Sequence, residues 1–213
     1  MKTIVISSQK GGSAKSTLAA LLSVEAERAG DGPAWLVDTD QQGTLSRWHE
    51  RREAERPQRA AIAFKGLAAG LAAIETKHQG AFCFIDTAPA ISDQSAAIIA
   101  LADLVLIPVQ PSPTDLWAVA ETIELVKQAG KPFRFIITKA KPQTNLTAQA
   151  IAALSHHGPV AQQFIVDRVG YAVAMAGGNT APELTPKGPA AMETAALWRE
   201  IKSTFHENNQ QRR

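Results

Sequence analysis

The sequence predicts a single α/β domain with a doubly wound, mostly parallel sheet and helices on both faces. Short apolar runs rich in β-branched residues recur along the chain, and a helix-like stretch follows each of them. Strands that are apolar throughout are typical of a parallel sheet buried on both faces. Strands that alternate with helices build βαβ units, which assemble into such a sheet.

Six strand–helix pairs follow one another along the chain. The expected strands cover residues 3–8, 34–37, 81–85, 104–109, 133–138 and 160–166. The helices that follow them cover residues 15–29, 44–55, 92–102, 114–129, 145–156 and 170–176. Residues 177–189 contain several Gly and Pro residues and are expected to form a long loop before a final helix over residues 190–207. The domain is therefore expected to span residues 1–207, with the polar residues 208–213 as a tail.

The composition is that of an ordinary globular protein and excludes several classes. Of the 213 residues, 45% are hydrophobic and 20% charged, which argues against disorder, and the net charge of +2 does not by itself indicate a nucleic-acid binder. The single cysteine, Cys83, excludes a disulfide framework and a cysteine-only metal cluster within one chain. The apolar run at residues 4–6 is too short for a signal peptide, and no segment approaches the ~20 apolar residues of a membrane span. We therefore expect a cytoplasmic protein without a membrane span.

Residues 10–17 read Lys-Gly-Gly-Ser-Ala-Lys-Ser-Thr, directly after the first expected strand and at the start of the first expected helix. A Gly-rich turn at a helix N-terminus points several backbone N–H groups at a phosphate. Lys15 supplies a cation for the β- and γ-phosphates, and the Ser16 hydroxyl is a ligand for Mg²⁺. The alternative is a Gly-rich turn with no ligand, which leaves the Lys-Ser pair unexplained. The segment therefore predicts a phosphate-binding loop.

The standard spacing G-x-x-x-x-G-K-[ST] fails, because Gln9 and Ala14 occupy the two glycine positions. The segment instead resembles the deviant Walker A motif, K-G-G-x-G-K-[ST], of the ParA/MinD family of P-loop ATPases. The resemblance implies that ATP and Mg²⁺ bind and that the nucleotide contacts Lys10, Gly11, Gly12, Ser13, Ala14, Lys15, Ser16 and Thr17. It also implies that the extra lysine, Lys10, reaches the partner subunit's nucleotide, so that ATP is sandwiched in a homodimer. A cation there would offset the repulsion between two facing triphosphates.

Ala14 departs from the family motif as well. If this position requires a positive φ, alanine costs roughly 1–2 kcal/mol and weakens ATP binding without abolishing it. If the backbone is right-handed, the methyl group is harmless or only crowds a phosphate. Both alternatives are compatible with the sequence.

Acidic residues follow two of the expected strands. Residues 38–43 resemble the family's D-x-D-P-Q-G, with Gln41 in place of proline, which implies that Asp40 positions the attacking water and that Asp38 lies near Mg²⁺. Taken alone, the pair is equally explained as helix capping. Asp86 ends the strand at 81–85 in Walker B form and is expected to hold Mg²⁺ through water. Because the carboxyl ends of parallel strands share one edge, the three carboxylates are expected to converge on one ion. The metal ligands are thus Ser16, Asp38 and Asp86, and the catalytic residues Asp40, Lys10 and Lys15.

Three further segments resemble the family less closely. The proline-rich stretch 108–115 is similar to a segment of small partition ATPases near the nucleotide and the dimer interface, which makes Pro108 a candidate contact. The alternative is a rigid turn that caps the helix from Thr114. Thr138 and Lys139 fall where the family contacts adenine, as do the residues around Arg168.

The resemblance covers nearly the whole chain and, without an N-terminal helix-turn-helix, points to the short partition ATPases. It implies a dimer that forms with ATP and binds non-specific DNA, so that the protein is expected on the nucleoid. It also implies a ParB-like adaptor that stimulates hydrolysis and releases the dimer from DNA. The cargo is DNA or another intracellular assembly. A MinD-like membrane switch and a metabolic ATP-dependent enzyme are the alternatives. The iron–sulfur reductases of the superfamily are excluded, since they need two cysteines per subunit.

Two groups of basic residues are candidates for DNA contacts. The arginines between residues 47 and 59 alternate with glutamates, which favours a solvated helix face. The preferred candidates are therefore C-terminal: Lys187, Arg199 and Lys202. An apolar stripe on the last helix is interpreted as packing on the sheet rather than as membrane insertion; it comprises Leu197, Trp198, Ile201 and Phe205.

Overall fold

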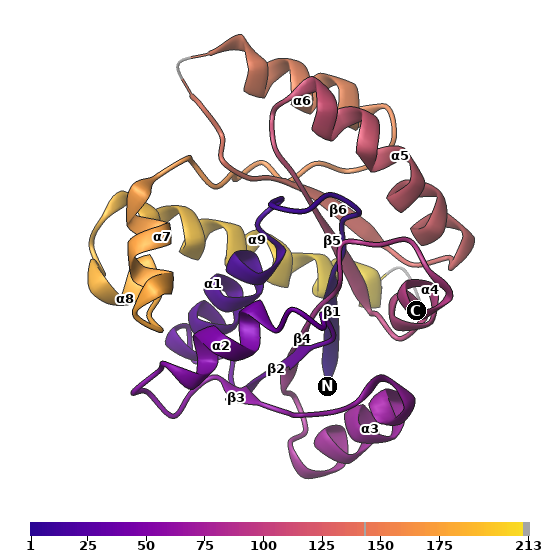
Figure 1. Cartoon of the computed structure of the whole chain (residues 1–213), viewed down its shortest axis with the longest axis vertical. Helices are drawn as coiled ribbons and strands as arrows, with labels where there is room; N and C mark the ends of the chain where they lie inside the picture. The colour runs from indigo at the N-terminus through magenta and orange to yellow at the C-terminus, as the bar shows by residue number, and fades with distance from the viewer. Residues whose placement is uncertain (143, 211–213) are drawn as a thin grey trace.

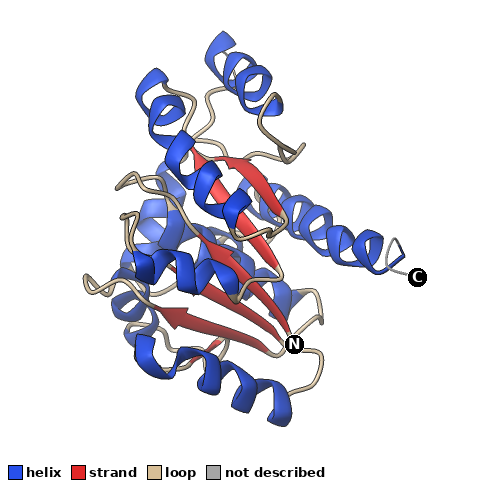
Figure 2. Ribbon diagram, turned by 90° about the vertical axis from the view of Figure 1, so that its right-hand side faces the viewer, coloured by secondary structure: helices blue, strands red, loops and turns tan. Residues whose placement is uncertain are grey.

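The computed structural model describes residues 1–142 and 144–210, with side chains up to Phe205 in the last helix. Six strands form one sheet in the order β3-β2-β4-β1-β5-β6, and all neighbouring strands are parallel. The strands are β1 (Lys2–Ile6), β2 (Ala34–Asp38), β3 (Gln58–Arg59), β4 (Phe82–Asp86), β5 (Leu104–Val109) and β6 (Phe133–Ile137). Helices cover both faces of this sheet (Figures 1 and 2), which confirms the predicted fold class.

The helices divide between the two faces according to the alternation of side chains along the strands. They are α1 (Lys15–Arg28), α2 (Thr44–Glu50), α3 (Leu67–Lys77), α4 (Asp93–Ala100), α5 (Pro113–Gln128), α6 (Asn145–Ser155), α7 (Val169–Ala176), α8 (Ala181–Leu184) and α9 (Pro189–Gln210). Ile4 and Ile6 pack in one apolar cluster with α1, α2 and α7–α9, whereas Val5 packs in another with α3–α6. Both faces of β1 are therefore buried, as its apolar sequence predicts.

The final helix lies against α1 and the sheet. The four residues of its apolar stripe are at most 7% exposed, so the packing interpretation is confirmed. The helix continues to Gln210, three residues beyond its expected end, and residues 211–213 lie outside the described part of the chain. Among the described helices, none combines the length and the apolar character needed to cross a bilayer. Cys83 is buried in β4, as expected for a core residue.

The predicted strand at residues 160–166 is wrong. Val160 forms an isolated bridge to Phe135 of β6, and Val166 forms another to Ala140, beyond the end of β6. Between the bridges, the backbone N–H groups of Gln162 and Gln163 donate to the Glu200 carboxylate of α9, at 3.0 and 3.1 Å. The Glu200 side chain therefore accepts the backbone hydrogen bonds that pairing with a neighbouring strand would need.

The segment between residues 50 and 81 also differs from the prediction. The second helix ends at Glu50, and Arg52 turns inward, with its side chain 2% exposed, to bond the Gly178 carbonyl at 2.9 Å and Glu183. Arg52 is therefore not part of a solvated face. Beyond it lie β3, a 3₁₀ turn (Phe64–Gly66) and α3, none of which was predicted. A third difference is the short α8 inside the expected loop at 177–189.

Candidate nucleotide site

The phosphate loop joins β1 to α1 at the carboxyl edge of the sheet. A cavity of about 340 Å³ opens over it, and loop residues from Gly11 to Thr17 form one wall. The other wall comprises Asp40, Gln42, Thr44, Pro89 and Lys139. Open α/β sheets bind ligands at this edge, where strand ends and a helix N-terminus meet.

Lys15, in the first turn of α1, is the buried cation of this cavity. It is 7% exposed, and its Nζ donates only a long 3.3 Å hydrogen bond to the Lys10 carbonyl. Burial lowers the pKa of Lys15, while the nearby carboxylates of Asp86 and Asp40 oppose that shift. A poorly hydrated ammonium at a helix N-terminus is a strong site for a phosphate oxygen.

Ser16 and Asp86 meet on the floor of the site. The Ser16 hydroxyl donates to Oδ2 of Asp86 at 2.5 Å, whereas Oδ1 of this 1% exposed residue has no hydrogen-bond partner. Burial raises the pKa of Asp86 to about 7. A hydroxyl beside a buried, unpartnered carboxylate oxygen is the donor set that Mg²⁺ and its water ligands require. The residues therefore fit the expected metal ion.

Asp38 accepts a backbone hydrogen bond at each of its carboxylate oxygens. Its Oδ1 accepts from the Asp40 backbone N–H at 3.1 Å, and its Oδ2 accepts from that of Ser46 at 2.8 Å. The carboxylate thus fixes the turn before α2, which is the capping alternative. Within the described residues, no three His, Cys, Asp or Glu side chains gather to hold a metal ion, so the expected convergence of three carboxylates on one ion is wrong. Asp40 does line the phosphate cavity, as its catalytic role requires.

Lys10 is held by its own chain. Its Nζ donates to Oγ1 of Thr114 at 2.9 Å and to the carboxylate of Asp115, in the first turn of α5. Asp115 is buried and also accepts a 2.5 Å hydrogen bond from the Ser112 hydroxyl. Sequence reasoning missed this pairing, because 105 positions separate Lys10 from Asp115. Lys10, which is expected to reach the partner subunit's nucleotide, is thus paired with the Asp115 carboxylate of its own subunit.

The proline-rich segment contacts the loop through a residue that the sequence did not single out. Pro108 is buried in β5 and does not line the phosphate cavity. Gln110 instead donates from Nε2 to the Gly12 carbonyl at 2.6 Å. Ser112 caps α5 and Pro113 is its first residue, so the capping interpretation of this segment is confirmed.

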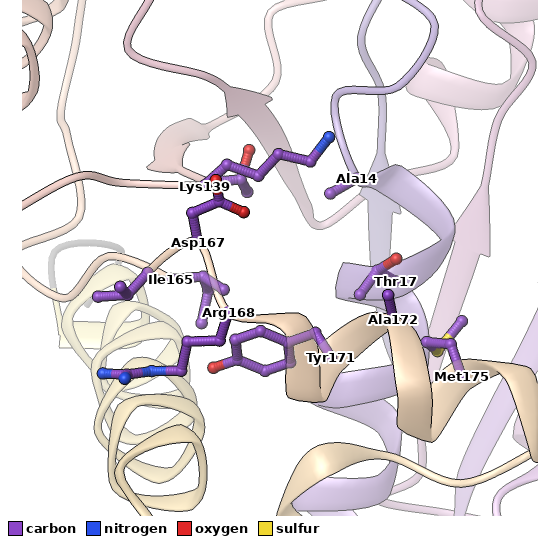
Figure 3. A pocket seen from close by; sticks show the side chains of 11 residues that line it. Ala14, Thr17, Lys139, Ile165, Asp167, Arg168, Tyr171, Ala172 and Met175 are labelled. Carbon is purple, nitrogen blue, oxygen red and sulfur yellow. The ribbon is translucent and has the colours of Figure 1, made fainter.

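A second cavity, of about 180 Å³, adjoins the first and is shown in Figure 3. Its lining comes from the start of α1, the end of β6, residues 165–168 and α7; it includes Ala14, Thr17, Thr138, Lys139, Ile165, Asp167, Arg168, Tyr171, Ala172 and Met175. The Arg168 guanidinium bonds Glu193 of α9, which also accepts from the Tyr171 hydroxyl at 3.0 Å. Thr138 donates to the Ser13 carbonyl at 3.1 Å and so braces the loop. A largely apolar recess beside a phosphate site suits a nucleotide base.

The basic residues predicted to contact DNA differ in their surroundings. Lys187 and Arg199 are exposed, before and on α9. Lys202 lies one turn after Arg199, and its amine pairs with the Asp31 carboxylate. Two of the three candidates are therefore exposed cations, and the third forms an ion pair at the surface.

The loop, its buried Lys15 with the adjacent Ser16, and the Walker B carboxylate define a P-loop nucleotide-binding domain. The chain belongs to the CobQ/CobB/MinD/ParA nucleotide binding domain family, whose model matches residues 4–181. Maintenance of carboxysome distribution protein A of Halothiobacillus neapolitanus is 25% identical over 201 residues, which cover 90% of this chain and 91% of the relative. Protein ParA of Rhizobium radiobacter is 28% identical over 130 residues, 60% of this chain and 57% of the relative.

Among solved structures, an ATP complex of a Cyanothece McdA variant matches with a TM-score of 0.77. The identity is 20%, and the match covers 97% of this chain and 96% of that one. This likeness establishes the shared fold. The expectation from the phosphate loop and the two acidic segments, a ParA/MinD-type domain, is thus confirmed.

The backbone at Ala14 decides between the two alternatives for this residue. Its φ of 73° and ψ of 27° are left-handed, so the alanine is strained. We expect Ala14→Gly to stabilise the protein by about 0.5–1 kcal/mol, because relief of roughly 1–2 kcal/mol exceeds the entropic cost of a glycine. Urea unfolding measures this, and ATP affinity should be unchanged or higher. Ala29→Gly is the control, since right-handed Ala29, with φ of −77°, should not gain stability.

The raised pKa of Asp86 predicts a pH-dependent stability for the nucleotide-free protein. Between its ordinary pKa of 3.8 and about 7 the folded state binds more protons than the unfolded state, so stability falls as pH rises through this window. Asp86→Asn removes the buried charge and should stabilise the protein at pH 8 by roughly 1–4 kcal/mol, with little gain at pH 4. The same variant should bind Mg²⁺-ATP more weakly. Thermal unfolding at both pH values tests this, and an equal gain at each would contradict it.

Proposed function

We propose that the chain is a positioning ATPase, which dimerises with Mg²⁺-ATP and binds non-specific DNA in that state. The observation that carries the proposal is the pair of lysines in one phosphate loop. Lys15 is buried in the phosphate cavity, and Lys10 precedes the residues that line it, with its side chain 34% exposed. Lys15 binds the phosphates of the subunit's own nucleotide. Lys10 becomes available to the nucleotide of a neighbouring subunit once its ion pair with Asp115 breaks.

Two carboxylates would serve hydrolysis: Asp40 at the cavity wall and Asp86, buried beside Ser16. Ser16 and Asp86 would hold Mg²⁺, which would supply positive charge against the β- and γ-phosphates. Asp40 orients the water, because it lines the same cavity and its Oδ1 is fixed by the Gln42 N–H at 2.9 Å. A carboxylate held by its own loop is suited to orient a nucleophile at low reorganisation cost.

The dimer is supported by a surface on α5. Thr114, Trp117 and Glu121 are spaced to lie on one helix face, beside the phosphate loop. Thr114 bonds Lys10, and Glu121 accepts from Nε2 of Gln9 at 2.7 Å. Trp117 is 75% exposed on this face. Exposed tryptophans are enriched at the centres of protein interfaces, so a partner subunit that receives Lys10 would also cover Trp117.

The named relatives support positioning as the cellular role. One is called a carboxysome distribution protein and another ParA, so the cargo is an intracellular assembly or DNA. In this proposal Lys187, Arg199 and Lys202 contact DNA phosphates on the nucleoid, in the cytoplasm. A ParB-like adaptor stimulates hydrolysis and releases the dimer. The MinD-like membrane role is disfavoured, because the apolar stripe of α9 is buried in the core and is not available to lipid.

A co-sedimentation assay with plasmid DNA and with anionic liposomes tests the proposal. Binding to DNA is expected with ATP and Mg²⁺ but not with ADP, and it should weaken steeply with salt, as phosphate contacts do. A Lys187→Ala/Arg199→Ala double variant should lose DNA binding while retaining ATP-dependent dimerisation. ATP-dependent binding to liposomes, with none to DNA, would overturn the proposal.

A further inference from the structure

Lys139 lies where the two cavities of the nucleotide site meet. It follows β6, and with Ala14 and Thr17 it belongs to the lining of both the phosphate cavity and the base cavity. Its side chain extends along the base cavity toward the phosphate loop, as Figure 3 shows. The family resemblance implies a contact with adenine at this position, but the charged end of the side chain lies nearer to the loop.

The amine is only weakly engaged in the free protein. Nζ donates to the Gly12 carbonyl at 3.3 Å, a long hydrogen bond on an exposed residue. Among the described residues it forms no ion pair, whereas Lys10 and Lys202 both do. The Gly12 carbonyl already accepts a shorter bond from Gln110. The ammonium is thus an unneutralised charge above a loop that binds phosphate.

The left-handed backbone of Lys139 is a second indication that the direction of its side chain serves a function. Its φ is 49°, and the other described non-glycine residue with a positive φ is Ala14, which borders the same two cavities. A left-handed lysine costs folding free energy and persists only where the surrounding structure enforces it; such residues gather at ligand sites.

We propose that Lys139 binds the polyphosphate chain of the nucleotide in its own subunit, as a second lysine beside Lys15. The proposal rests on nucleotide binding at this site and adds a residue to it. An amine that donates to a phosphate oxygen would replace the long bond to Gly12 with a charge-assisted one. The phosphate loop, which is strained at Ala14, would thereby gain a cation from outside its own motif.

Lys139→Met tests the proposal, because it removes the charge and keeps the length of the side chain. Affinity for ATP and ADP should fall by about tenfold in calorimetric titrations, the effect of one charge-assisted hydrogen bond. Affinity for adenosine, measured by NMR titration, should stay the same. The loss for ATP should shrink as salt is raised, and Lys139→Arg should retain most of the affinity.

Two control variants separate binding from folding and from net charge. Lys141→Met removes an exposed lysine two residues away that lines neither cavity and should leave ATP affinity unchanged. Lys139→Gly relieves the left-handed strain, so it should unfold at a higher temperature than the native chain yet bind ATP as weakly as Lys139→Met. An equal loss for adenosine and ATP would assign Lys139 to the base, and no loss would remove it from the site. A native chain that does not bind ATP would contradict the nucleotide site itself.

Discussion

Replacing Lys15 with alanine is expected to lower ATP affinity by at least about a hundredfold, which would abolish binding in a calorimetric titration. The lysine is buried against the loop and donates only a long bond to the Lys10 carbonyl, so it is free to bind the β- and γ-phosphates. Each charge-assisted hydrogen bond contributes about 1.5–3 kcal/mol, and two of them account for a loss of this size. Other contacts of the loop come from backbone N–H groups, which do not supply a full charge.

Lys77→Ala is the control, because it removes an exposed lysine at the end of α3. It should bind ATP as the native chain does. The unfolding temperature of each variant, measured without nucleotide, establishes that the loss is not one of folding. Unchanged ATP affinity in Lys15→Ala would contradict the assignment of residues 10–17 as the phosphate loop.

Lys10→Ala is expected to retain nucleotide binding within a few-fold yet lose ATP-dependent dimerisation. In the free chain Lys10 bonds Thr114 and Asp115, so the phosphates of its own subunit do not depend on it. Across a dimer it would meet the γ-phosphate of the partner's ATP, and its loss would leave two triphosphates without that shielding charge. Light scattering with a slowly hydrolysed ATP analogue measures the effect. Hydrolysis and DNA binding should disappear together with the dimer.

Asp115→Asn is the matched variant for this prediction. It weakens the hold on Lys10 and keeps the size of a buried side chain that also accepts from Ser112. Since less free energy is then needed to release the lysine, dimers should form at severalfold lower protein concentration. A Lys10→Ala protein that dimerises normally would show that Lys10 has no role across the interface.

The sequence predicted the parts of the molecule whose interactions are local. The apolar run Leu104–Val109 is buried on both faces, and the phosphate loop is one contiguous segment. The edge strand β3 has only two residues and no apolar run, so no pattern marks it. Helix α3 does have a signal in the sequence, since Leu67, Leu71 and Ile74 bury one face at helical spacing.

The other differences arise from hydrogen bonds that no residue pattern shows. Glu200 takes the N–H groups of Gln162 and Gln163, and this cannot be read from the apolar run that contains them. Asp38 is a strand-end carboxylate in the sequence, but two backbone N–H groups already satisfy it. The position at a strand end shows which carboxylates share an edge of the sheet, and the hydrogen bonds show which of them also fixes a helix start.

The surroundings of the four tryptophans give the protein a built-in optical signal. Trp48 and Trp198 are at most 2% exposed, and Trp35 is half-buried beside the His78 ring. Trp117 alone among them stands in water, on the face of α5 proposed to meet a second subunit. Indole emission shifts to shorter wavelength when water is removed, so the red part of the spectrum belongs to this one side chain. Assembly could thus be followed in real time without a label, and a Trp117→Phe chain would supply the silent background.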